Sequence, residues 1–156
     1  MALTGFLKLP DIDGESLQEE HENEIDVYGV RWGAELNLPT TGARRVRSRA
    51  ETGPMVIHKF YDAASPYLAD ALSRSMKLDE AIFTARAFGA EAPFDYLTIT
   101  LTNARIIDYE MHNTERDDTD DRIMERVEIA FEQMSILYRR QTSTGNVIEH
   151  EVEIRG

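Results

Sequence analysis

The chain has 156 residues, and its 29 acidic and 17 basic side chains give a formal net charge of −12. It contains no cysteine, which excludes a disulfide scaffold, thiolate metal sites and a cysteine nucleophile. Its acidity argues against nucleic-acid binding, and its apolar runs are shorter than the roughly 20 residues of a membrane-inserted helix.

The first residues lack the basic start and the apolar stretch of a cleaved signal peptide. We therefore expect a chain made in the cytoplasm without such a signal. Residues 5–9 predict a short strand. The next segment, residues 11–26, carries eight acidic side chains and neither lysine nor arginine, and it is typical of a solvated loop.

Residues 28–38 alternate without interruption, because every even position is apolar. The odd positions hold small or polar side chains, namely Gly29, Arg31, Gly33, Glu35 and Asn37. A period of two predicts one half-buried strand with a core face and a second, polar face. Trp32 lies on the apolar side of this pattern, and it is interpreted as a core residue in preference to a platform for a ligand.

The longest connection follows at residues 39–54. It contains four arginines and no acid between positions 44 and 49, namely Arg44, Arg45, Arg47 and Arg49. Loops of this length are uncommon and are usually functional or disordered. Segregated charge of opposite sign suggests complementary surfaces on neighbouring copies of the chain.

Further alternating segments predict strands at residues 55–61, 80–88, 96–102 and 104–111. Between them, one helix is expected from about residue 66 to residue 76. Ser65 can cap it, Pro66 suits its first position, and Leu68, Leu72 and Met76 are spaced four apart on one face.

The segment from residue 121 to residue 140 fits either a helix or strands by its periodicity. As strands it needs a bulge near Glu132 and Gln133, because the parity of the apolar positions shifts there. Residues 143–146 read as a turn before a final alternating strand at residues 148–154. The chain is thus expected to be a single domain, mainly β, spanning residues 1–156.

The search for catalytic chemistry is negative. The four histidines, His21, His58, His112 and His150, are far apart in sequence, and no nucleophile elbow, phosphate-binding loop or dinucleotide fingerprint is present. An enzyme built on these histidines stays a minor alternative. We expect no catalytic residue, no metal and no cofactor.

Several segments together resemble the haemolysin-coregulated protein (Hcp) family, whose members form the inner tube of the type VI secretion system. The similar segments are residues 6–9, 14–16, 24–27 with Trp32 and Gly33, 59–66, 96–101, and 121–122 with Glu125. The resemblance implies an antiparallel β-barrel or two-sheet sandwich with one short flanking helix, and strands rather than a helix over residues 121–140.

The resemblance also implies a function. Members of the Hcp family assemble as homo-hexameric rings that stack into a tube. A contractile sheath drives this tube out of the cell beneath a spike protein. Small effectors ride in the lumen, and secretion by the type VI apparatus delivers the protein outside the cell or into a target cell. The resemblance assigns no role in binding nucleic acid or inserting into membranes. An alternative is a secreted effector-binding carrier ring without a long tube.

Two sets of site residues follow from this resemblance. The polar face formed by Gly29, Arg31, Gly33 and Glu35 would line the lumen and meet cargo. The extended loop at residues 39–54 matches a loop that projects toward a neighbouring ring, so its four arginines would serve ring assembly. This loop carries arginines where many family members are glycine-rich, which leaves the geometry of stacking open.

Overall fold

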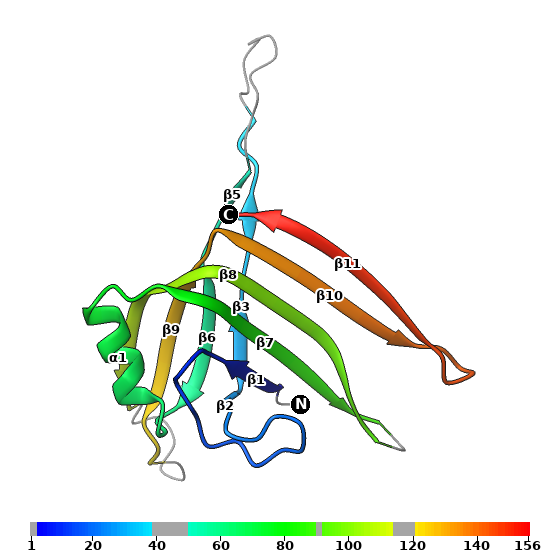
Figure 1. The fold of residues 1–156 in the computed structure, drawn as a ribbon, viewed down its shortest axis with the longest axis horizontal. Helices are drawn as coiled ribbons and strands as arrows, with labels where there is room; N and C mark the ends of the chain where they lie inside the picture. The colour runs from blue at the N-terminus through cyan, green and yellow to red at the C-terminus, as the bar shows by residue number, and fades with distance from the viewer. Residues whose placement is uncertain (1–2, 39–49, 90–91, 114–120) are drawn as a thin grey trace.

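The computed structural model describes residues 3–38, 50–89, 92–113 and 121–156, and these form eleven strands and one helix (Figure 1). In chain order the elements are β1 (Thr4–Lys8), β2 (Ile25–Val27), β3 (Gly29–Arg31), β4 (Ala34–Glu35), β5 (Glu51–Thr52), β6 (Met55–Phe60), α1 (Ser65–Ser73), β7 (Leu78–Phe88), β8 (Pro93–His112), β9 (Met124–Ala130), β10 (Gln133–Gln141) and β11 (Val147–Arg155).

One long strand, β8, organises the sheets. Its first half pairs with β7 and β10, and its second half pairs with β9. Asn103, which has a positive φ of 52°, lies where the strand passes from one set of partners to the other. All pairings are antiparallel, in the order β2-β1-β7-β8-β9-β6-β3, with β10 and β11 branching from β8.

The core lies between the two halves of this bent sheet (Figure 1). Fully buried side chains include Leu7 of β1, Phe83 of β7 and Leu101 of β8 on one side, and Ile57 of β6 and Ile129 of β9 on the other. The predicted mainly β, antiparallel fold with one short helix is therefore confirmed. The strands do not close into a complete barrel ladder, because the path ends at β2 and β3.

Those two end strands are consecutive in the chain, and Tyr28 lies between them. The Tyr28 N–H donates to the carbonyl oxygen of His58 in β6 at 3.0 Å. The same short segment thus pairs with β1 before Tyr28 and with β6 after it.

The predicted strand over residues 28–38 is wrong in its extent. It breaks after Arg31 and resumes only at Ala34 and Glu35, which pair with Thr52 and Glu51 as a two-stranded stem that projects from the sheets (Figure 1). Past this point the apolar positions have no core beneath them. Leu36 and Leu38 are 52% and 66% exposed.

The segment with two readings, residues 121–140, forms strands β9 and β10, as the resemblance implied. The predicted shift in parity is present, since β9 ends at Ala130 and β10 begins at Gln133. The Glu132 N–H donates to the carbonyl oxygen of Thr102 at 3.0 Å across this break. β10 and β11 form the final hairpin, which turns at Gly145 with a φ of 85°.

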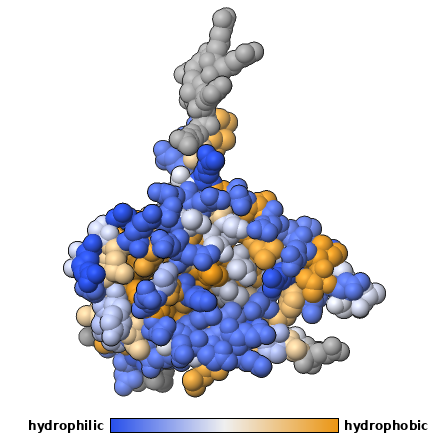
Figure 2. All heavy atoms as spheres, viewed as in Figure 1, coloured by the Kyte–Doolittle hydropathy of each residue, from blue (hydrophilic) through white to orange (hydrophobic). Residues whose placement is uncertain are grey.

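The β10–β11 hairpin extends past the core. Tyr138 and Val152 lie on the face of the hairpin that packs on the core where the hairpin is near β8. At their own positions the core no longer covers this face, and the two side chains are 42% and 57% exposed. Figure 2 shows apolar side chains gathered on this side of the molecule, to the right in the view, and hydrophilic ones over the loop before β2.

The helix α1 covers the core with Leu68 and Ala71, both fully buried. It begins at Ser65, with Ala64 as the N-cap residue, and Pro66 occupies its first turn as expected. The prediction that Ser65 caps the helix is wrong. Its buried hydroxyl instead accepts from the Lys59 ammonium at 3.0 Å and donates to a Glu125 carboxylate oxygen at 2.7 Å.

The helix also ends earlier than the predicted residue 76. Ser75 adopts a positive φ of 49°, and the N–H groups of Ser75 and Met76 donate to the carbonyl oxygens of Leu72 and Ala71. This is a Schellman ending, which stops the helix while satisfying its last carbonyl groups.

The hydroxyl of Ser65 belongs to a buried charged cluster between β6, β9 and α1. Lys59 and Glu125 are fully buried and hydrogen-bond to each other. The Lys59 ammonium also contacts an Asp62 carboxylate oxygen at 2.9 Å. Tyr109 donates to the second oxygen of Glu125, and burial together with this neighbouring carboxylate raises the pKa of the Tyr109 phenol. The cluster fastens the start of the helix to the sheet.

A second charged cluster holds the acidic loop before β2 against the β7–β8 hairpin. The His21 ring nitrogens lie 2.9 Å from a Glu24 carboxylate oxygen and 2.8 Å from one of Asp95. Arg86 donates to the other oxygen of Asp95 at 2.6 Å and to the carbonyl oxygen of Glu19 at 3.1 Å. The ring of Phe6 stacks on His21 with centroids 4.3 Å apart.

Candidate functional site

The half-sheet made of β3, β6, β9 and the end of β8 has one face on the core and one face away from it. Strand register places Gly29, His58 and Arg126 in one row of the outer face, because directly opposed residues in antiparallel strands share a face. The adjacent row holds Arg31, Val56 and Glu128. The outer face is therefore polar and charged.

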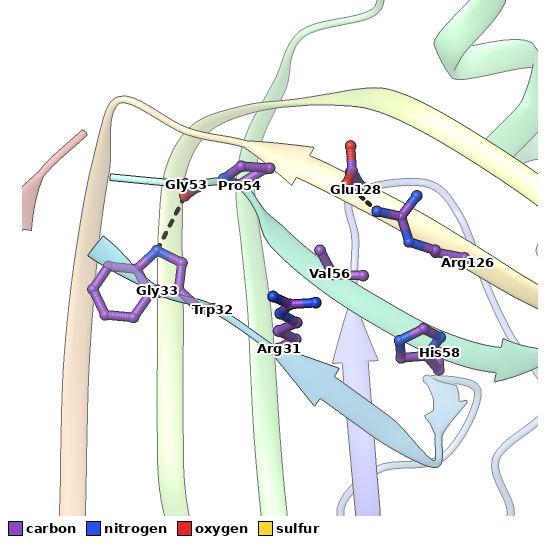
Figure 3. Close-up of a pocket in the computed structure, with 9 residues that line it drawn as sticks. All are labelled: Arg31, Trp32, Gly33, Gly53, Pro54, Val56, His58, Arg126 and Glu128. Carbon is purple, nitrogen blue, oxygen red and sulfur yellow. Dashed lines mark hydrogen bonds and ion pairs between the residues drawn. The ribbon is translucent and has the colours of Figure 1, made fainter. Parts of the chain in front are cut away.

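A hollow of about 610 Å³ lies on this face, where β3 meets β6 and β9 (Figure 3). Its lining residues are Arg31, Trp32, Gly33, Gly53, Pro54, Val56, His58, Arg126 and Glu128. The indole N–H of Trp32 donates to the carbonyl oxygen of Gly53 at 3.1 Å, which fixes the ring at one end of the hollow. In Figure 3 the guanidinium of Arg31 lies between this indole and the imidazole of His58.

The structure brings the first predicted set of site residues to this region in different ways. Arg31 and Gly33 line the hollow itself. Gly29 lies beneath His58, where an added Cβ would be 3.2 Å from the His58 Cβ. Glu35 is exposed and lines a neighbouring hollow of about 370 Å³ with the β4–β5 stem. The second set, Arg44, Arg45, Arg47 and Arg49, lies outside the described residues.

Arg126 and Glu128 of the lining were not singled out from the sequence, and His58 was named only among the four histidines considered for an enzyme. The alternation of residues 55–61 already places His58 opposite to the buried Ile57 and Lys59, and the same holds for Arg126 and Glu128 around Val127. No local signal indicates that these two strands pair in the register that brings the three side chains together.

The two arginines of the hollow differ in their partners. Arg126 is bound by Glu128 and lies 3.6 Å from an Asp108 carboxylate oxygen. Arg31 is exposed and has no carboxylate or other hydrogen-bond acceptor within the described part of the chain. The hollow therefore contains one arginine whose charge is balanced and one whose charge is not.

His58 is held in its neutral form at neutral pH. Burial lowers the pKa of its imidazole, and the positive charges of Arg126 and His112 lower it further. At pH 7 the His58 imidazole is therefore a neutral hydrogen-bonding group. It does not contribute a positive charge to the hollow beside that of Arg31.

The electrostatic cause can be tested by titration. In ¹³C-labelled histidine spectra we expect His58 to titrate below the ordinary histidine pKa of about 6.5. Arg126→Gln removes one repelling charge, so the midpoint should rise. A His58 midpoint above that of a free histidine, or one that falls in the variant, would contradict this explanation.

The described residues contain no group of three or more histidine, aspartate or glutamate side chains arranged to hold a metal ion. Among the same residues, no helix is long and apolar enough to cross a membrane. The arrangement at the hollow offers recognition groups, namely a guanidinium, an imidazole and an indole.

Comparisons with known proteins agree across sequence and structure. Residues 6–138 match the family model described as "Type VI secretion system effector, Hcp". The protein hcp1 of Pseudomonas aeruginosa is 29% identical over 148 residues, which cover 93% of this chain and 88% of that protein.

Solved structures have the same fold over nearly their whole length. A type six secretion system protein superposes with a TM-score of 0.83 at 21% identity, covering 96% of this chain and 91% of its own. Hcp1 from Salmonella typhimurium gives a TM-score of 0.73 at 26% identity, with coverage of 97% and 94%. At 21% identity, the first of these likenesses concerns the fold alone.

Proposed function

The chain belongs to the Hcp family of type VI secretion proteins, and from this premise we propose that it is a structural subunit of the secretion tube. In this role the chain forms homo-hexameric rings, and the rings stack into a tube with small effectors in the lumen. The single observation that carries the proposal is the family match over residues 6–138. Hcp proteins are a structural, secreted family rather than an enzyme family, and the proposal assigns this chain no catalytic residue.

The geometry of the outer face supports a wall subunit. A half-sheet whose second face carries Arg31, Arg126 and Glu128 is unsuited to further burial, since charged side chains are costly to bury without partners. A surface that faces a water-filled lumen or a hydrated cargo avoids that cost. We therefore propose that the face with Gly29, Arg31, Gly33 and Glu35 lines the lumen.

The further partners of this role are a spike protein at the tip of the tube and a contractile sheath around it. The protein would be made in the cytoplasm. The type VI apparatus would then release it outside the cell or into a target cell. A carrier ring that binds effectors without forming a long tube remains the second candidate, favoured by the hollow around Arg31.

Assembly should depend on the arginine cluster. We expect wild-type protein to give a mass of about 107 kDa by light scattering, six times the 17.8 kDa of one chain. Reversing Arg44, Arg45, Arg47 and Arg49 to glutamate together should abolish ring stacking or lower the mass, because these charges would meet acidic surfaces of neighbouring copies. Single changes are a poor test, since one exposed ion pair contributes only about 0–1 kcal/mol.

The matched control replaces the same four arginines by lysine, which keeps the charge. The lysine variant should assemble as the wild type does at low salt. Rings and stacks that are unchanged in the glutamate variant would rule out the role of the arginine cluster. A wild-type chain that stays monomeric at high concentration would count against the tube itself.

A further inference from the structure

The exposed guanidinium of Arg31 indicates which kind of ligand the hollow can bind. Arg31 points its guanidinium into an open hollow, and the other arginine among the described lining residues, Arg126, is occupied by Glu128 and Asp108. A guanidinium offers paired N–H donors that match a carboxylate in a bidentate arrangement. One free guanidinium therefore fits one carboxylate.

The hollow is not uniformly polar. Trp32 and Pro54 line the end toward the β4–β5 stem, and Val56, which is 7% exposed, lies in the row of Arg31. A flat indole next to a proline ring is a contact surface for an apolar side chain. The Trp32 hydrogen bond to Gly53 keeps this surface in place before any ligand arrives.

We propose that this hollow binds an extended peptide segment in which an aspartate or glutamate stands next to an apolar residue. The carboxylate pairs with Arg31, and the apolar side chain lies against Trp32 and Pro54. The inference rests on the proposed carrier role, because it names the chemistry of the cargo segment that the polar face would hold. A free inorganic anion would use only the charged half of the hollow.

The chain has a single tryptophan, and it lines this hollow, so its fluorescence reports on the site. The experiment titrates the full-length protein with acetyl-Leu-Glu-Leu-amide and, separately, with acetyl-Leu-Gln-Leu-amide. We expect a saturable change in Trp32 emission, with the glutamate peptide binding about tenfold more tightly, as a hydrogen bond to a charged group predicts. Salt at about 0.5 M should weaken only the glutamate peptide.

Arg31→Gln should remove this preference, so that both peptides bind equally weakly. Because Arg31 is exposed, this variant is expected to fold, and far-ultraviolet circular dichroism checks it. Arg74→Gln is the matched control, since it removes an exposed arginine from α1 and should keep the preference. Equal binding of the two peptides to the wild type would overturn the proposal, as would an equal response to sodium acetate or inorganic phosphate.

Light scattering on the same samples separates this inference from the tube proposal. Rings that do not discriminate between the two peptides would overturn the inference and leave the tube role standing. A monomer that prefers the glutamate peptide would support the inference while contradicting the tube role.

Discussion

Replacing Lys59 by methionine should lower the free energy of unfolding by about 3–5 kcal/mol, the range measured when one partner of a buried ion pair is removed. Lys59 and Glu125 are both fully buried, so the variant leaves a carboxylate without its cation in the core. Ser65 and Asp62 lose the same ammonium group. Urea unfolding at one fixed protein concentration measures the difference.

Two further variants make this prediction sharper. Lys59→Met combined with Glu125→Met removes both charges of the fully buried pair, and it should cost less than the sum of the two single changes, because neither Lys59 nor Glu125 is left buried without the other. Arg74→Met breaks an exposed pair with Asp70 and should change stability by no more than about 1 kcal/mol. A Lys59→Met protein as stable as the wild type would contradict the described cluster.

Asp95→Asn should be the second strongly destabilising change, by about 2–3 kcal/mol at pH 7. Arg86 is 7% exposed and His21 is equally buried, and Asp95 accepts hydrogen bonds from both. Hydrogen bonds to charged groups contribute about 1.5–3 kcal/mol. The variant keeps the shape of the side chain but loses its charge, so the acidic loop before β2 is held less firmly.

The same variant has a defined pH dependence. Burial works to raise the pKa of Asp95, but the hydrogen bonds from Arg86 and His21 outweigh it and hold the pKa below its ordinary value. A lowered carboxyl pKa contributes stability above the unfolded value of about 3.9, and this contribution is lost as the pH falls through the folded value. The difference in unfolding free energy between wild type and Asp95→Asn should therefore shrink below about pH 4.

Asp108→Asn provides the control for this comparison, since Asp108 is half exposed and 3.6 Å from its arginine. Its effect should be small across the same pH range. A difference for Asp95→Asn that stays constant or grows between pH 7 and pH 3 would show that the carboxylate of Asp95 does not act in this way.

The strands could be predicted where alternation coincides with a buried face. Residues 55–61, 80–88 and 96–102 alternate, and all three ranges coincide with strands that contribute to the core. The first matches β6 to within one residue, and the other two lie within β7 and β8. The same pattern over residues 28–38 gave a wrong prediction of one continuous strand. Alternation indicates which side chains share a face, but it does not indicate whether a core lies beneath that face. Leu36 and Leu38 share a face and remain exposed.

Contacts between residues far apart in the chain explain the other differences between the predictions from sequence and the structure. Ser65 has the sequence context of a helix cap, but its hydroxyl is taken by Lys59 and by Glu125, which is 60 residues away in the chain. His58 reaches the hollow of Arg31 through the register of β3 with β6, and Arg126 reaches it through the register of β6 with β9. Local pattern carries no information about these registers, so sequence reasoning could not show that these side chains meet.

Electron microscopy of the purified full-length protein tests the tube proposal most directly. The proposal predicts ring-shaped particles with six-fold symmetry and an open centre in top views, and stacks of these rings in side views. A field of uniform particles of single-chain size, at the concentration and low salt that favour assembly, would contradict it.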